Sequence, residues 1–156
     1  MFRINRRTDY AVRVMLSLAK RPFDQRISTR AVQEEMLVPR PYLQRIVADL
    51  ARAGLIRTSP GPHGGLQLAR SAESISLRQV WEAIEGPLLI SDCLKACGVC
   101  PLDQGCPVRS HWGRLQGLLA QELESLTLAQ LAVETHQLSF PFALEGTRAD
   151  PIIRPG

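Results

Sequence analysis

Hydrophobic residues recur at helical spacing near the start of the chain. One group follows the i, i+3, i+4, i+7 pattern that marks one face of a helix: Ala11, Val14, Met15 and Leu18. A second, short helix is predicted to begin at a cap formed by Ser28 or Thr29 and to run through Leu37. Pro39 and Pro41 then predict a turn, because the residue before a proline is disfavoured in helical conformation.

The turn leads into a third helix, which Pro41 can begin and Gly54 can end. Its apolar positions form an inner face: Leu43, Ile46, Val47 and Leu50. Its outer face is polar and mostly basic: Arg40, Gln44, Arg45, Asp49 and Arg52. Two short β-prone runs, 55–58 and 66–68, flank the Gly- and Pro-rich loop 59–65, and this arrangement predicts a hairpin.

Helical patterns return after the hairpin. Ser76 and Gln79 form the capping box of a fourth helix, which ends at Gly86. Apolar residues with an average spacing of about 3.6 then mark a long amphipathic helix: Val108, Trp112, Leu115, Leu119, Leu123 and Leu126. Thr127 and Gln130 cap a last short helix, 128–134, and the proline-containing tail after it is expected to be loose.

The order helix, helix, tight turn, helix, hairpin is that of a winged helix-turn-helix. The predicted fold class is therefore mostly α with a small β-hairpin wing, in which a long dimerisation helix follows the winged helix-turn-helix. Four segments are expected: a DNA-binding domain over 1–86, a cysteine-containing loop over 87–107, the dimerisation helix and short C-terminal helix over 108–135, and a flexible tail over 136–156.

Composition and charge narrow the class of protein. With 156 residues, of which 45% are hydrophobic and 22% charged, the chain can bury a core. Residues 1–70 hold 13 basic and 5 acidic residues, a balance of +8, and residues 71–156 hold 6 and 10, a balance of −4, which together give the net +4. No apolar run has the about 18 residues of a membrane span, and no signal-peptide core is present, so a cytoplasmic location is expected.

The basic first half favours a polyanionic partner, although a solvated charged surface explains the charge equally well on its own. In a winged helix-turn-helix the third helix enters the major groove, and its side chains here are Arg40, Tyr42, Gln44 and Arg45. Arginine pairs with guanine and glutamine with adenine. Further groups are expected to reach phosphates or the groove beside the wing: Arg3, Arg6, Arg7, Arg52, Arg57 and His63.

The apolar stripe of the long helix needs a cover. Packing against the winged helix is one solution, and packing against a second subunit is the other. We favour the second, because two-fold dimers are the commonest oligomers and a two-fold reader matches an inverted-repeat operator. The predicted partners are therefore double-stranded DNA and a second copy of the chain.

All four cysteines lie within one short segment: Cys93, Cys97, Cys100 and Cys106. Disulfides are rare in the cytosol, and clustered thiolates select zinc or iron–sulfur clusters. A zinc finger would show two separated ligand pairs, whereas one Cys-x2-Cys pair is present here. The spacing favours a cluster over zinc.

A thiol switch and a small iron–sulfur electron carrier or enzyme subunit are the alternatives. An electron carrier has no use for the arginine-rich half of the chain. No catalytic constellation is found, so no enzyme is predicted.

An ordered set of motifs resembles the Rrf2 family of bacterial regulators, which includes IscR, NsrR and RirA. The motifs are TDYAVR at 8–13, PYL at 41–43, AGLI at 53–56, GPHGGL at 61–66, the cysteine loop, and LTL at 126–128. The resemblance implies a homodimer joined by the long helix, with a [2Fe–2S] or [4Fe–4S] cluster near the DNA-binding domain. The family's three cysteine ligands correspond to Cys93, Cys100 and Cys106. It also implies a sensor of iron–sulfur status, nitric oxide, iron or redox state.

Several positions depart from the family pattern. Arg109 stands where IscR-like members place a histidine ligand, and His111 is out of register. Asp9 stands where NsrR-like members use an aspartate, so we predict it as the fourth ligand, donated by the other subunit. The competing interpretations are that Asp9 caps its helix and that His111, Cys97 or a small thiol supplies the fourth ligand. Pro60 replaces the usual wing arginine and Cys97 matches no standard position, and the cluster region resembles NsrR or RirA more than IscR.

Overall fold

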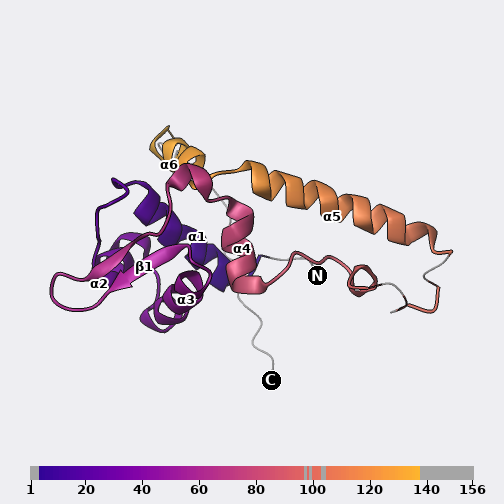
Figure 1. Cartoon of the computed structure of the whole chain (residues 1–156), viewed down its shortest axis with the longest axis horizontal. Coiled ribbons are helices and arrows are strands. Elements are labelled where there is room, and N and C mark those ends of the chain that lie inside the picture. The colour runs from indigo at the N-terminus through magenta and orange to yellow at the C-terminus, as the bar shows by residue number, and fades with distance from the viewer. Residues whose placement is uncertain (1–3, 97, 99, 103–104, 138–156) are drawn as a thin grey trace, which may run out of the picture.

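Helices and one hairpin make up the fold in the computed structural model, which describes residues 4–96, 98, 100–102 and 105–137. The helices are α1 (Arg6–Ala19), α2 (Thr29–Met36), α3 (Arg40–Arg52), α4 (Leu77–Glu85), α5 (Pro107–Ser125) and α6 (Leu128–Gln137). The strands are β1 (Ile56–Ser59) and β2 (Gly65–Leu68), and the 3-10 turns are η1 (Ala72–Ser74) and η2 (Asp92–Leu94). The predicted mostly α fold with a hairpin wing is confirmed, and α5 runs outward from the winged helix (Figure 1).

Local hydrogen bonds explain where the helices begin. Ser28 caps α2 by accepting from the backbone N–H of residue 31, and Ser76 with Gln79 forms the predicted capping box of α4. The cap of α1 is Asn5, whose side-chain oxygen accepts from the Arg7 N–H at 2.7 Å. The alternative in which Asp9 caps this helix is therefore wrong.

Three helix boundaries differ from the sequence-based expectation. Helix α2 ends at Met36, because Leu37 adopts a left-handed conformation with φ of 52°. Helix α3 begins at Arg40, so Pro41 occupies its second position instead of its first. Helix α6 continues to Gln137, three residues beyond the predicted end. The first two residues of the expected flexible tail over 136–156 therefore belong to this helix, and the rest of that tail lies outside the described residues.

The core lies between α1, α3, α4, β2 and α6. Met15 of α1, Ile46 of α3 and Val80 of α4 are fully buried, together with Leu66 of β2 and Leu128 of α6. Burying one such large aliphatic side chain contributes about 1.5–3 kcal/mol. The inner faces predicted for the first and third helices are thus confirmed, except that Val47 is half-buried.

The hairpin is joined to the start of α2. β1 and β2 pair antiparallel, with Ile56 opposite Leu68. Ile27 extends this sheet through two backbone hydrogen bonds with Leu66, of 3.0 and 2.8 Å. A Cβ atom at position 65 would collide with the Ile27 carbonyl, so Gly65 permits this close approach. The wing therefore has a fixed base beside α2 and α3.

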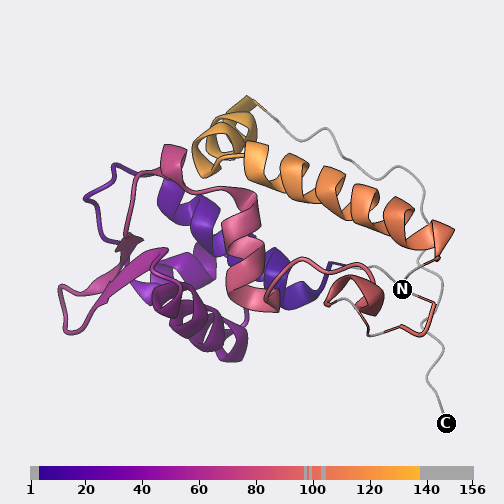
Figure 2. The ribbon, with the colours of Figure 1, turned by 45° about the vertical axis from the view of Figure 1, so that its right-hand side comes forward.

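Two backbone hydrogen bonds join the chain at the C-terminal end of α5 to the winged helix. The Leu77 N–H donates to the Leu126 carbonyl at 2.8 Å, and the Leu128 N–H donates to the Ile75 carbonyl at 2.9 Å. These bonds place α6 against the core, whereas α5 has no buried residue in a single chain. Figure 2 shows α5 along the outside of the domain, with the cysteine segment leading to its far end. None of the helices described is long and apolar enough to cross a membrane.

Candidate nucleic-acid interface and cysteine segment

The outer face of α3 presents the side chains predicted to read DNA. Arg40, Tyr42, Gln44 and Arg45 are all exposed. A groove of about 520 Å³ separates α3 from α2 and is lined by Thr29, Arg30, Gln33, Glu34, Arg40, Leu43 and Gln44. Long polar side chains on an exposed helix, beside a second helix with basic and hydroxyl groups, suit a contact with base edges and phosphates.

The N-terminal part of α1 holds α3 at two points. The ring of Tyr10 meets that of Tyr42 edge-on, with centroids 5.3 Å apart. Arg7 forms an ion pair with Asp49, which also accepts from Arg52 at 2.9 Å. The sequence placed Asp49 on the outer face, yet its side chain is 13% exposed. The pattern missed this pair because Arg7 lies 42 positions away and nothing local marks it.

The wing offers two further candidates. Arg57 on β1 and His63 in the loop are both exposed, so each is accessible to a ligand. Pro60 is exposed at the position where an arginine is usual in the family that the motifs resemble. Arg3, another DNA-contact candidate, lies outside the described residues.

The cysteine segment joins α4 to α5. Cys93, Cys100 and Cys106 carry free thiols and are half-buried, and Cys97 lies outside the described residues. Cys93 lies in η2, with its sulfur 3.1 Å from the Ser91 hydroxyl. Cys106 is the N-cap residue of α5, and its side chain makes no capping hydrogen bond.

The three cysteines are suitable ligands for a thiophilic metal, although they do not converge on one point in a single chain. Three thiolates suit zinc or iron–sulfur chemistry. Among the described residues, no three Cys, His, Asp or Glu side chains converge closely enough to hold one ion. Metal binding often brings together ligands that lie apart in the metal-free protein. The chemistry of the three thiols therefore supports a metal site.

Charged groups surround two of the candidate ligands. Beside Cys93, the hydrogen bond and positive charge of Lys95 lower the pKa of the Asp92 carboxyl. Asp9 pairs with Arg13 at 2.7 Å, and both side chains are about half exposed. The Asp9 carboxylate is therefore accessible from solvent. His111, another candidate for the fourth ligand, is exposed, with its Nδ1 2.8 Å from Arg114.

The apolar stripe of α5 is partly uncovered. Leu119 and Leu123 are half-buried, whereas Trp112 and Leu115 are 42% and 43% exposed. Leu118, which the predicted stripe did not include, is 61% exposed. Contiguous exposed apolar side chains on one helix mark an interaction surface.

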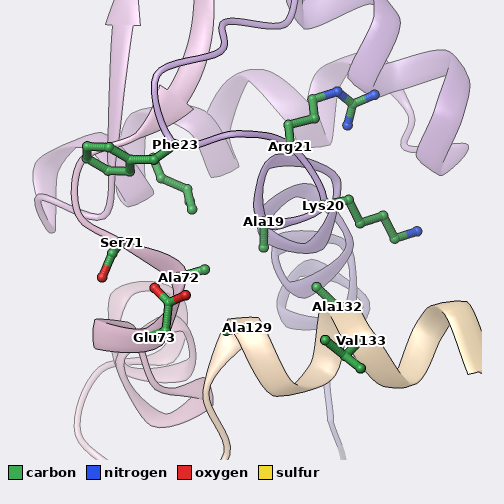
Figure 3. Close-up of a pocket in the computed structure, with 11 residues that line it drawn as sticks. Ala19, Lys20, Arg21, Phe23, Ser71, Ala72, Glu73, Ala129, Ala132 and Val133 are labelled. Carbon is green, nitrogen blue, oxygen red and sulfur yellow. The ribbon is translucent and has the colours of Figure 1, made fainter.

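A further pocket lies away from both candidate sites. It has a volume of about 350 Å³ and lies between the end of α1, η1 and α6. Figure 3 shows Phe23 at its rim and the small side chains of Ala129 and Ala132 along its floor. Charged groups stand at its edge, and neither the cysteines nor the residues of α3 line it. We therefore assign it no role in DNA or metal binding.

Comparison with known proteins places these features in context. The Rrf2 family model, described as an iron-dependent transcriptional regulator, matches residues 4–134. The Rrf2 protein of Nitratidesulfovibrio vulgaris is 30% identical over 129 residues, which are 83% of this chain and 86% of that protein. The HTH-type transcriptional regulator NsrR of Shouchella clausii is 27% identical over 132 residues, covering 84% and 89%. The crystal structure of Staphylococcus aureus CymR superposes with a TM-score of 0.64 at 31% identity, covering 82% and 96%.

Proposed function

The chain belongs to the Rrf2 family of DNA-binding transcriptional regulators, and we propose that it acts in the cytoplasm as a homodimer whose operator binding is set by an iron–sulfur cluster. Members of this family are regulators and not enzymes. The operator is an inverted repeat, because a two-fold dimer presents two α3 helices related by that symmetry. The signal is redox state, nitric oxide or iron availability.

One observation carries this proposal. Three half-buried free thiols occupy the segment that leads directly into the exposed helix α5. A helix whose apolar side is uncovered requires a partner, and the cysteine segment lies at its N-terminal end (Figure 1). A cofactor held there is adjacent to the proposed subunit contact, so its state can affect how the two winged helices are placed relative to each other.

The ligands of the cluster are Cys93, Cys100 and Cys106, together with the Asp9 carboxylate of the second subunit. A bound cluster supplies a centre that oxygen, nitric oxide or loss of iron can alter. Thiolates provide strong soft ligands, whereas a carboxylate is a weaker ligand for such a centre. The exposure of Asp9 on α1 supports its part in this proposal, because a buried carboxylate could not be shared between subunits.

Anaerobic purification tests the cofactor. We expect a coloured protein with visible absorption and with iron and sulfide in comparable amounts. Zinc in place of iron would identify a structural zinc site, and protein without either metal would identify a thiol-based regulator. Either outcome would contradict the proposed cluster without contradicting the proposed DNA binding.

Replacing Arg45 by alanine tests DNA reading by α3. We expect operator affinity to fall by about 1–3 kcal/mol and the preference at one base pair to relax, because an arginine that pairs with guanine is lost. Anisotropy titrations on single-base operator variants measure both effects. Arg114→Ala on α5 removes the same charge away from α3 and is expected to leave the base preference unchanged. Unaltered operator affinity in Arg45→Ala would contradict base reading by this residue.

A further inference from the structure

The carboxylate of Asp49 lies between arginines from two helices. One oxygen, Oδ2, accepts from Nη2 of Arg7 at the start of α1. The other, Oδ1, accepts at 2.9 Å from Nη1 of Arg52 in the last turn of α3. Both oxygens of the single acidic residue on α3 are therefore engaged by positive charges.

Arg45 lies one helical turn before Asp49. Residues four apart on a helix are neighbours, so the Arg45 guanidinium can reach the Asp49 carboxylate. In the structure Arg45 is exposed and forms no ion pair with any residue that is described. The position of Asp49 against Arg7 explains this, because the carboxylate is turned toward α1 and its oxygens are occupied.

The side chain of Arg7 is largely occupied by this contact. Its side chain is 37% exposed, and its Nε is buried without a hydrogen-bond partner in the part of the chain that the structure describes. A buried donor that lacks a partner is unfavourable, so an arginine that served only to meet solvent or phosphate would not be placed in this way. Its ion pair with Asp49 is the interaction that holds it here.

A second contact keeps α3 on α1 independently of this ion pair. Tyr10, one turn after Arg7, meets Tyr42 edge-on. Leu43, Ile46 and Leu50 of α3 are buried in the core. Removing the charges of Arg7 and Asp49 is therefore expected to leave α3 docked, which makes variants at these positions informative about DNA binding.

We propose that Arg7 is a positioning residue for DNA recognition, which engages Asp49 and thereby keeps Arg45 available to the operator. This inference rests on the proposed reading of DNA by α3. Without Arg7, the Oδ2 atom of Asp49 loses its partner and the carboxylate can pair with Arg45 on the same helix. The variant then loses more than one positive charge, because the base-reading group is also withdrawn.

The test compares Arg7→Met, Arg6→Met and the double variant Arg7→Met/Asp49→Asn. An operator is first selected from random duplexes with the wild-type dimer, and affinities are measured on it and on an unrelated duplex at one salt concentration. We expect Arg7→Met to lower operator affinity by about 1.5- to 2.5-fold more than affinity for the unrelated duplex, because an ion pair between residues four apart on a helix withdraws Arg45 only in part. The double variant is expected to recover most of this preference, because its asparagine carries no charge to pair with Arg45.

Arg6→Met is the matched control, since Arg6 is an exposed arginine of the same helical turn. It is expected to weaken binding to both duplexes by the same factor, as loss of a non-specific charge does. Equal losses on both duplexes in Arg7→Met, or no recovery in the double variant with unchanged circular dichroism and melting temperature, would overturn the inference. A wild-type protein without any sequence preference would instead overturn the proposed function, and this inference with it.

Discussion

Leu115→Glu is expected to convert the proposed dimer into monomers and to lower operator affinity by about 10²–10⁴-fold. Leu115 is exposed in the single chain and lies beside Trp112 and Leu118, which are also exposed. A carboxylate placed in an apolar contact between subunits must lose its hydration without a partner, and this cost opposes association. A monomer then binds one half-site, so it loses the high effective concentration that links the two α3 helices.

Sedimentation velocity and operator titrations measure the two effects separately. Gln121→Glu is the matched control, because it adds the same charge at an exposed polar position of α5 outside the apolar stripe. This variant is expected to remain a dimer and to bind the operator as the wild type does. A dimeric Leu115→Glu protein at micromolar concentration would show that α5 does not join the subunits through this face.

Sequence patterns predicted most of the winged helix because local physics determines it. The i, i+3, i+4 stripes of α1 and α3 mark faces that are buried, and serine hydroxyls cap α2 and α4 as the sequence indicates. The Gly- and Pro-rich loop 59–65 likewise predicts the hairpin. Each of these signals lies within a few residues of the element that it specifies.

Features that depend on distant residues could not be predicted in this way. Asp49 has a polar neighbourhood along α3, so the helical pattern places it on the outer face, although Arg7 draws it toward α1. A tertiary contact decides the position of Asp49, and no spacing rule within one helix contains it. The cap of α1 is a different case, because Asn5 accepts from the Arg7 N–H only two residues away and is a residue type that helix starts favour, whereas Asp9 lies within the first turn and pairs with Arg13.

The cysteine segment shows the same limit for a cofactor. The sequence supplies the number and kind of ligands, because thiols at 93, 100 and 106 are soft donors whatever their positions. Their convergence depends on how an irregular segment folds, and metal binding itself contributes to that folding. The kind of ligand is therefore a property of the sequence, whereas the convergence of these half-buried thiols is a property of the folded, metal-bound protein.

Cys93→Ser, Cys100→Ser and Cys106→Ser are each expected to lose the iron, the sulfide and the visible absorption of the anaerobically purified protein. Serine offers a hard oxygen in place of a soft thiolate. Removal of an outer-shell partner alone costs about 10–100-fold in metal affinity, so removal of a ligand is expected to cost at least as much. Iron and sulfide analysis with absorption spectra, under identical anaerobic conditions, measures the loss.

Cys97→Ser and Asp9→Ala complete the series and separate the ligands from their neighbours. Cys97→Ser is the matched control, and it is expected to keep both iron and colour.

Asp9→Ala is expected to keep the three thiolates and therefore to bind a cluster. The spectrum of this cluster is expected to be altered and its lifetime in air shorter, because the proposed fourth ligand of the cluster is lost. It is also expected to show a smaller difference in operator affinity between the protein with and without cluster, since Asp9 is the proposed link to the second subunit. Loss of the chromophore in Cys97→Ser would contradict the assignment of the three cysteines. An unchanged spectrum and affinity ratio in Asp9→Ala would leave its pairing with Arg13 as its structural role and direct the search for the fourth ligand to His111 or Cys97.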